Sequence, residues 1–223
     1  MTYLQISEQS ELIVYLQAAP VASIIFAITI ASSLMAFYND NIYGNMILHP
    51  ASVSRGQRVY TLITSGLIHA DYMHLIFNML SYFFFAFQLE VDLGHWQFGM
   101  LYILSLIASD LPTVYKHRFD DWYHCLGASG AVSAVIFSFI MFHPLVKMNL
   151  IGLPPQLGIP AVLFGVLYLI YCNYASKHAR DNVNHDAHFF GALSGMLITI
   201  FLNPHIVNSF LNQIIGGVQS IFH

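Results

Sequence analysis

Apolar residues occur along this chain in blocks that are long enough to predict membrane-spanning helices. No charged residue occurs between Leu12 and Asn39, and this length crosses a bilayer with some tilt. Pro20 is expected to kink this first span or to mark its effective start. Five further apolar stretches lie at 72–89, 96–109, about 127–146, 159–176 and 187–203. The pattern therefore predicts six spans, in one domain over residues 12–203.

The segments outside these stretches are more polar. Residues 1–11 form a short polar N-terminus. Residues 39–71 mix charged residues with apolar pieces that are too short to span, which predicts an ordered or interfacial loop. The third span, at 96–109, is short unless it continues through Pro112. In 204–223, apolar residues recur at spacings of three and four, which predicts an amphipathic helix at the interface rather than a seventh span.

Composition agrees with a membrane protein. Hydrophobic residues make up 57% of the chain and charged residues only 8%, with a mean hydropathy of +0.64, whereas soluble domains carry about a quarter charged residues. The net charge of −4 and the lack of a basic patch argue against nucleic acid as a partner. Cys125 and Cys172 form no metal-binding pattern and are interpreted as small apolar fillers. We expect an all-α polytopic membrane protein in the lipid bilayer.

Polar side chains within the predicted spans converge at one depth. If there are six spans, the second, fourth and sixth enter the membrane from the same side. His74 and Asn78 lie near the start of the second span, Ser129 near the start of the fourth and His188 near the start of the sixth. At 1.5 Å per residue, all lie about one to two turns below one surface. Intramembrane ionisable residues are often functional, although a serine at a helix start is usually only a cap.

Small residues favour close contact between the fourth and sixth spans. Gly191 and Gly195 form a GxxxG face one turn beyond His188, and such faces let helices approach closely. Close approach is what a hydrogen bond between Ser129 and His188 requires. His74 and Asn78, spaced i and i+4, share a helix face; the alternative is a hydrogen-bonded pair that only holds helices together.

The ordered set of motifs resembles the rhomboid intramembrane serine proteases, from about residue 60 to 195. It consists of Gly127-Ala128-Ser129-Gly130 on the fourth span, Ala187-His188 with Gly191 and Gly195 on the sixth, His69, His74 and Asn78 at the second, and Glu90 with Gly94 after it.

The resemblance implies a six-helix rhomboid-like bundle that cleaves transmembrane segments of other membrane proteins near the membrane surface, without a cofactor or metal. It implies that Ser129 is the nucleophile and His188 the general base of a dyad. It also implies that His74, Asn78 and the Ser129 N–H bind the oxyanion. Structural support is assigned to His69, Glu90, Gly94, Gly127, Gly130, Gly191 and Gly195.

Two positions depart from the family pattern. Tyr60 and Thr61 stand where the family commonly has Trp-Arg, with Arg58 as a possible substitute. Ser133 stands where many bacterial members place an aromatic residue against the catalytic histidine, so something else must hold His188. Asp186 is expected on the opposite helix face from His188, which favours a dyad over a triad.

Two other function classes stay open. A rhomboid-like pseudoprotease would bind membrane clients without cutting them, but Ser129, His188 and the absence of a proline at Ala128 argue against it. A metal site or transporter built on the histidine pairs near spans two and six is disfavoured, because no intramembrane carboxylate or HExxH motif accompanies them. That set comprises His69, His74, His185 and His188.

The predicted location is the bacterial inner membrane, and neither a natural substrate nor an oligomeric state follows from the residues. Loops on the motif side hold six basic residues, Arg55, Arg58, Lys116, Arg118, Lys177 and Arg180, against Lys147 alone on the other side. The positive-inside rule would place the site toward the cytoplasm, whereas the common family arrangement places it outside. The family arrangement is kept as the expected orientation, although the loop charges conflict with it.

Overall fold

A computed structural model describes residues 17–149, 154, 158–179, 181 and 183–220 of the 223-residue chain. The predicted polar N-terminus at 1–11 and the beginning of the first span lie outside the described residues.

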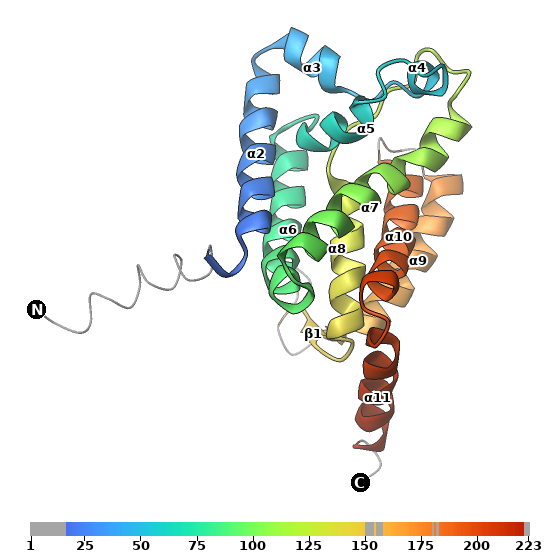
Figure 1. Ribbon diagram of the computed structural model, residues 1–223. Coiled ribbons are helices and arrows are strands. Elements are labelled where there is room, and N and C mark those ends of the chain that lie inside the picture. Colours follow the sequence, from blue (N-terminus) through green and yellow to red (C-terminus); the bar gives the residue numbers. More distant parts are fainter. Residues whose placement is uncertain (1–16, 150–153, 155–157, 180, 182, 221–223) are drawn as a thin grey trace, which may run out of the picture.

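Long helices stand side by side in a bundle, one for each predicted apolar stretch (Figure 1). They are α2 (Pro20–Phe37), α6 (Tyr72–Leu93), α7 (His95–Lys116), α8 (Ser129–Phe142), α9 (Ala161–His178) and α10 (His185–Leu202). Within the described ranges, α2, α6, α7 and α10 are long and apolar enough to cross a membrane, and α8 is a shorter apolar helix. The chain is therefore a membrane protein with four candidate spans by this criterion, and the count of six stays a prediction.

The helix ends lie where the sequence places breaks. The helix α2 begins at Pro20, which occupies the first turn, where a missing N–H and a fixed φ are tolerated. The helix α7 runs through Pro112 to Lys116, so the third span extends beyond 109, as its predicted continuation requires. Gly94 separates α6 from α7.

A buried carboxylate holds three helices together at one end of the bundle. Glu90 of α6 is fully buried, and its oxygens accept hydrogen bonds from the N–H groups of Val21 (3.1 Å) and Ala22 (2.6 Å). It also contacts Nδ1 of His95, at 2.7 Å, in the first turn of α7. A negative charge at a helix N-terminus is favourable, so Glu90 caps α2 and fixes it against α6 and α7. These contacts support the structural role predicted for Glu90.

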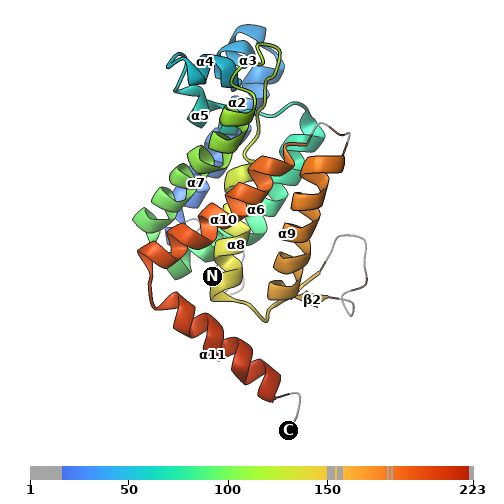
Figure 2. The ribbon, with the colours of Figure 1, turned by 90° about the vertical axis from the view of Figure 1, so that its right-hand side faces the viewer.

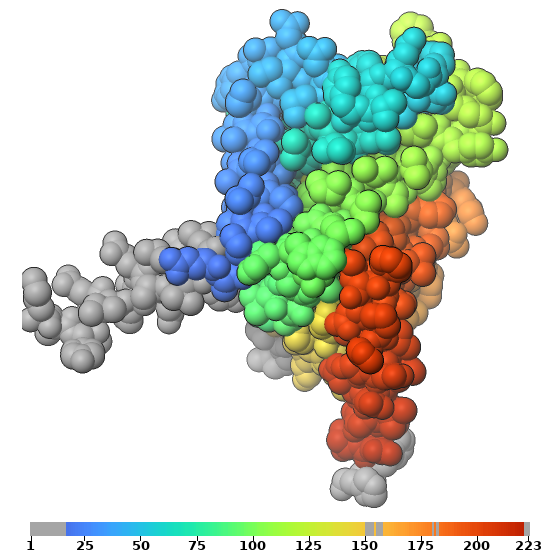
Figure 3. Space-filling view, in the orientation of Figure 1, coloured from blue at the N-terminus to red at the C-terminus, as the bar shows by residue number. Residues whose placement is uncertain are grey.

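The segment at 39–71 is ordered, as predicted. It forms the helices α3 (Asp40–Met46), α4 (Pro50–Ser54) and α5 (Thr61–Thr64), followed by the 3₁₀ helix η1 (Ser65–Leu67). Figures 1 and 3 show these elements as a layer over one end of the bundle, called the capped end below. Arg58 Nη2 donates to the carbonyls of Gly44 (2.5 Å) and Asn45 (3.1 Å), so it fixes the end of α3.

The helix α8 is the centre of the bundle and contacts α6, α7, α9 and α10 (Figures 1 and 2). Its contact with α10 leaves no room for side chains at two points. A Cβ on Gly191 would overlap the carbonyl oxygen of Gly130, and one on Gly195 would overlap the backbone of Ala134. The GxxxG face of α10 thus lies directly against the small residues of α8.

The main apolar core lies between α2, α6, α7 and α8. Tyr82 of α6 is fully buried there, with its ring 5.7 Å from that of Tyr102 and 6.4 Å from that of Phe98. Its hydroxyl donates to the carbonyl of Ala22 at 3.2 Å. This satisfies the polar end of a buried tyrosine and connects α6 to α2.

Short elements complete the end of the bundle opposite the capped end. The strands β1 (Lys147–Met148) and β2 (Ile159–Pro160) pair antiparallel between α8 and α9. After Asn203 the chain turns into α11 (Ile206–Gln219), which projects beyond the bundle (Figures 1 and 2). The predicted amphipathic helix exists, and Gln213 Nε2 donates to the carbonyl of Phe142 at 3.1 Å. Its placement at the membrane interface stays a prediction.

Replacing Gly191 with alanine is expected to destabilise the fold, because the new methyl group would meet the backbone of Gly130, which cannot rotate away. Overpacking of this kind costs about 1–3 kcal/mol. The free energy of unfolding, measured in mixed detergent micelles, should fall by that amount.

The matched control is Gly216→Ala in α11, where a Cβ meets nothing within 4 Å. Alanine exceeds glycine in helix propensity by about 1 kcal/mol, so this variant should be unchanged or slightly more stable. Equal stability of Gly191→Ala and wild type would contradict close backbone contact between α8 and α10.

Candidate active site

Ser129 occupies the N-terminus of the central helix. It is the first residue of α8, with Ala128 as the N-cap and no capping side chain. The first N–H groups of a helix have no intrahelical partner and lie at the positive end of its dipole. In the described part of the chain, the Ser129 N–H is hydrogen-bonded to no other group. It can therefore donate to a negative charge that forms beside the serine.

Gly127 shapes the turn that leads into the serine. Its φ of +117° is one that residues with a side chain rarely adopt. Its N–H donates to the carbonyl of Ser65 at 2.9 Å, and a Cβ at this position would lie 2.7 Å from Cε1 of His74. The imidazole of His74 therefore packs directly over the backbone at Gly127.

His69 fixes the same turn through a chain of hydrogen bonds. The Ala128 N–H donates to Nε2 of His69 at 3.4 Å. Because this nitrogen accepts, Nδ1 of the neutral ring carries the proton and donates to Oγ of Ser33 at 3.0 Å. The Ser33 hydroxyl then donates to the carbonyl of Leu67 at 3.1 Å. The network connects α2 to the residue before the candidate nucleophile.

This network requires an uncharged His69. The residue is fully buried and lies between η1 and α6, outside the membrane-spanning helices. Burial and, to a smaller extent, the nearby His74 lower the pKa of His69 from 6.5 to about 3, and Asp71 acts in the opposite direction. A protonated ring would have no lone pair for the Ala128 N–H.

His74 presents a hydrogen-bond donor to the serine turn. The Ala70 N–H donates to Nδ1 of His74 at 3.4 Å, so the neutral ring carries its proton on Nε2. Nε2 lies 2.9 Å from the position that a Cβ of Gly127 would occupy. Asp71 caps α6 by accepting from the His74 N–H at 2.8 Å, and this holds the start of the helix.

Asn78 lies one turn further along α6 and is buried. Its Nδ2 donates to the carbonyl of His74 at 3.0 Å. An amide nitrogen carries two hydrogens, so this bond leaves one of them for another acceptor. The bond also fixes the side chain on the helix face that it shares with His74.

His188 lies in the first turn of α10, which Asn184 caps by accepting from the Ala187 N–H at 3.1 Å. The ring of Tyr168, from α9, lies nearly parallel to that of His188, with centroids 6.4 Å apart and planes at 18°. The Tyr168 hydroxyl is hydrogen-bonded to Oγ of Ser133 at 2.9 Å. An aromatic ring therefore lies beside His188, but it comes from α9 and not from position 133 of α8. Sequence reasoning missed Tyr168, because it lies on a span without a motif.

The backbones around Ser129 and His188 adjoin each other. A Cβ on Gly130 would lie 3.4 Å from the carbonyl oxygen of Ala187. The Ser129 hydroxyl and the His188 ring are not hydrogen-bonded to each other in the described chain. Catalytic hydrogen bonds are often long before a substrate binds. The structure brings the two residues to one place without closing the bond between them.

A small cavity lies beside the serine. It has a volume of about 20 Å³, and its lining includes Ser129, Asp110 and Asn184. This is room for one water molecule, which needs at least two polar partners. Polar groups of α7, α8 and α10 thus meet next to the candidate nucleophile.

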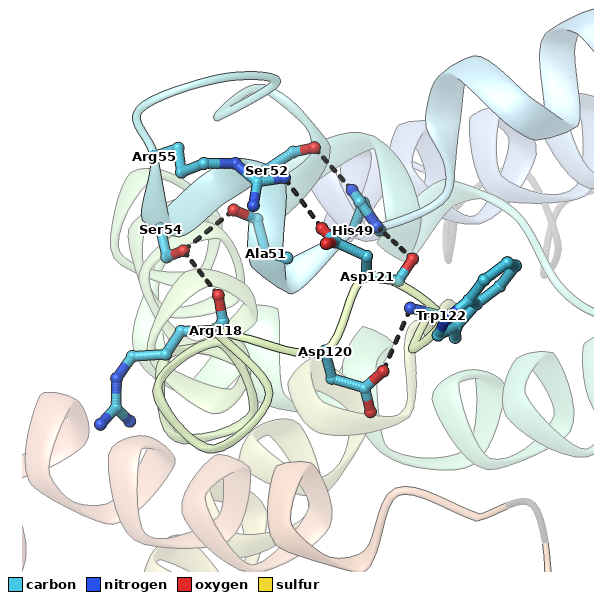
Figure 4. Close-up of polar contacts among 9 residues, drawn as sticks. All are labelled: His49, Ala51, Ser52, Ser54, Arg55, Arg118, Asp120, Asp121 and Trp122. Carbon is cyan, nitrogen blue, oxygen red and sulfur yellow. Dashed lines mark hydrogen bonds and ion pairs between the residues drawn. The ribbon is translucent and has the colours of Figure 1, made fainter.

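Contacts with residues 48–55 hold the segment before the serine, and part of them is drawn in Figure 4. Leu48 and Cys125 exchange backbone hydrogen bonds at 3.0 and 3.1 Å. His49 Nε2 donates to the carbonyl of Asp121 at 3.0 Å, and Arg55 forms an ion pair with the Asp121 carboxylate at 3.0 Å. Sequence analysis did not identify these contacts, because none of the partners is close in the sequence.

Two acidic side chains near His188 have other partners. Asp186 contacts Nζ of Lys116 at 2.6 Å, and its exclusion from a triad stays a prediction. Asp181 contacts Nε2 of His185 through both carboxylate oxygens at 3.2 Å.

A protein-family model described as the Rhomboid domain matches residues 56–205 of the chain. The chain is 34% identical over 140 residues to "Putative rhomboid protease YdcA" of Bacillus subtilis, covering 63% of this chain and 65% of that protein. It is 26% identical over 190 residues to "Rhomboid protease GlpG" of Photorhabdus laumondii, covering 85% and 64% respectively. It is 23% identical over 197 residues to "RHOMBOID-like protein 12, mitochondrial" of Arabidopsis thaliana, covering 80% and 58%. The chain therefore spans less than two thirds of the length of each of these relatives.

Replacing His69 is expected to change how stability depends on pH. The unfolded chain takes up a proton on this ring near pH 6.5, whereas the native ring resists protonation down to about pH 3. Acid therefore favours the unfolded state between these values, by up to about 1.4 kcal/mol per pH unit. Wild type should lose stability more steeply than His69→Gln as pH falls, measured as the free energy of unfolding in mixed micelles.

The control is His205→Gln, which removes an exposed histidine at the start of α11. Its curve should follow that of wild type. Parallel curves for wild type and His69→Gln would contradict a native ring that stays neutral.

Proposed function

The chain belongs to the rhomboid family, and we propose on this premise that it is an intramembrane serine endopeptidase using a Ser129–His188 dyad. One observation carries the proposal. The unpaired N–H of Ser129 at the start of α8, Nε2 of His74 over Gly127 and His188 beside Tyr168 come from three helices to one place. A nucleophile, a base and hydrogen-bond donors within one small region are what acyl transfer needs.

The proposed mechanism follows from the positions of these groups. The Ser129 hydroxyl attacks the carbonyl carbon of the substrate while His188 takes its proton, and the protonated His188 then gives the proton to the leaving amine. Negative charge develops on the carbonyl oxygen. The helix dipole of α8, the Ser129 N–H and the Nε2–H of His74 can stabilise it, with the second amide hydrogen of Asn78 as a further donor. Water, for which the adjoining cavity has room, releases the acyl chain.

We place the substrates among transmembrane segments of other membrane proteins. The groups of the dyad lie in the first turns of α8 and α10, near the capped end of the bundle, where water can reach a cleavage site. A helical substrate must unwind there, because its carbonyls are otherwise hydrogen-bonded. The bacterial relatives favour a bacterial inner membrane as the location.

The second candidate is a pseudoprotease that binds membrane proteins without cleaving them. Ser129, His188 and the free N-terminus of α8 argue against it, because binding alone does not require them.

Ser129→Ala and His188→Ala are each expected to abolish cleavage of a labelled transmembrane substrate by the purified protein in detergent. Loss of either member of a catalytic dyad lowers kcat by about 10³-fold or more. Ser129→Ala should also prevent covalent labelling by a fluorophosphonate probe. Ser176→Ala, whose hydroxyl only donates to the Asn173 carbonyl in α9, is the control and should retain activity. Undiminished cleavage by Ser129→Ala would overturn the proposal.

Tyr168→Ala is expected to lower kcat by up to about 10²-fold, because small misplacements of a catalytic group have effects of this size. The KM should change little, since Tyr168 is proposed to position His188 rather than to contact substrate. Tyr168→Phe keeps the ring and should restore most of kcat. Tyr174→Ala is the control on the same helix, since this exposed ring stacks on His178. Equal kcat for Tyr168→Ala and wild type would contradict the positioning role.

A further inference from the structure

A cluster of metal-binding side chains lies beside the proposed base. Cys172 of α9 and His185 and His188 of α10 each offer one ligand atom, and these atoms lie within 4.8 Å of one another. Cys172 is fully buried and His185 is 5% exposed. Figure 2 shows the two helices side by side. The sequence analysis interpreted Cys172 as an apolar filler, because no motif indicates that α9 packs against α10.

His185 carries an unused lone pair inside this cluster. Its Nε2 lies 3.2 Å from both oxygens of Asp181, which can only accept, so Nε2 carries a proton. Nδ1 of the neutral ring then has a free lone pair. In the described chain, this buried atom has no hydrogen-bond partner, and leaving a buried acceptor unpaired is unfavourable. A carboxylate on the far nitrogen of a histidine is the arrangement that orients and strengthens a metal ligand.

We propose that Cys172, His185 and His188 form a site for a zinc-class transition-metal ion, and that its occupation switches the enzyme off. One thiolate and two imidazoles match the donor preference of Zn²⁺. Tetrahedral coordination would bring the ligand atoms to roughly 3.5 Å apart, a small contraction from the present separation. The thiolate and the Asp181 carboxylate together balance the charge of a divalent ion.

The consequence for catalysis rests on the proposed function. A metal bound to the nitrogen of His188 that faces Ser129 occupies the lone pair that must take the serine proton. A metal bound to the other nitrogen leaves the ring proton on the nitrogen that faces Ser129, so that nitrogen has no lone pair to accept the serine proton. In both cases His188 cannot act as a general base.

Cobalt provides a test of the site that does not depend on activity. Co²⁺ bound to a thiolate gives an intense near-ultraviolet charge-transfer band, and the chain has only two cysteines. Titrating the purified full-length protein with Co²⁺ should produce this band in wild type and in the control Cys125→Ser, and not in Cys172→Ser. The absence of this band in wild type would overturn the site, because Cys172 would then not bind the metal ion.

A second variant keeps the test decisive if Cys172→Ser does not fold. Asp181 is exposed and lies four residues before His185, and Asp181→Asn weakens the acceptor that orients His185. Loss of such a partner lowers metal affinity by about 10–100-fold, so the Co²⁺ titration should shift to higher concentration by this factor. An unshifted titration would overturn the assigned role of His185.

Zinc inhibition completes the experiment. Cleavage is measured for each variant in Zn²⁺ and, as its own baseline, in EDTA. Wild type and Cys125→Ser should be inhibited reversibly, and the zinc concentration for half inhibition should rise by about tenfold or more in Asp181→Asn. A Co²⁺ band without zinc inhibition would overturn the switch. No cleavage in EDTA would instead overturn the proposed function, with the Co²⁺ result still deciding the site.

Discussion

The arrangement of the site depends on direct backbone contact between α8 and α10. At Gly191 the contact is so close that a methyl group would overlap the carbonyl of Gly130. Close packing of small residues is a main source of helix association where lipid removes the hydrophobic driving force. It also sets the distance between the first turns of the two helices. Ser129 precedes Gly130, and His188 precedes Gly191 by one turn, so the same contact fixes the proposed nucleophile and the proposed base.

A second constraint fixes the direction of the serine turn. The neutral ring of His69 accepts from Ala128 and, through Ser33, reaches the first helix of the bundle. The backbone hydrogen bonds between Leu48 and Cys125 hold the same turn from the capped end of the bundle. The N–H groups of Cys125, Gly127 and Ala128 are thereby paired, whereas that of Ser129 has no partner in the described chain. An unpaired N–H away from water is costly, so its presence beside the serine is consistent with a site that receives a negatively charged intermediate.

Much of this architecture could be predicted from the sequence, because local patterns specify it. The six apolar stretches correspond to six helices, the start at Pro20 follows from proline geometry, and the order of the motifs identified the family. Other features could not be predicted, because they depend on contacts between distant segments. Tyr168 facing His188, Leu48 pairing with Cys125 and Cys172 meeting the histidines of α10 all require knowing which helix neighbours which. The length of α8 was overestimated, since apolar residues continue to Val146 although the helix ends at Phe142.

Because position 133 is a serine, the aromatic neighbour of the proposed base His188 comes from another helix. An aromatic residue on α8 would place nucleophile and support on one rigid element. In this chain the support is Tyr168, so the orientation of His188 depends on the position of α9 as well as on the contact of α8 with α10. The same helix contributes Cys172 to the proposed metal site. A metal that bridges Cys172 and His188 would therefore hold α9 against α10 as well as remove the base. Control of the proposed base through α9 thus follows from the position of Tyr168 on a helix other than α8.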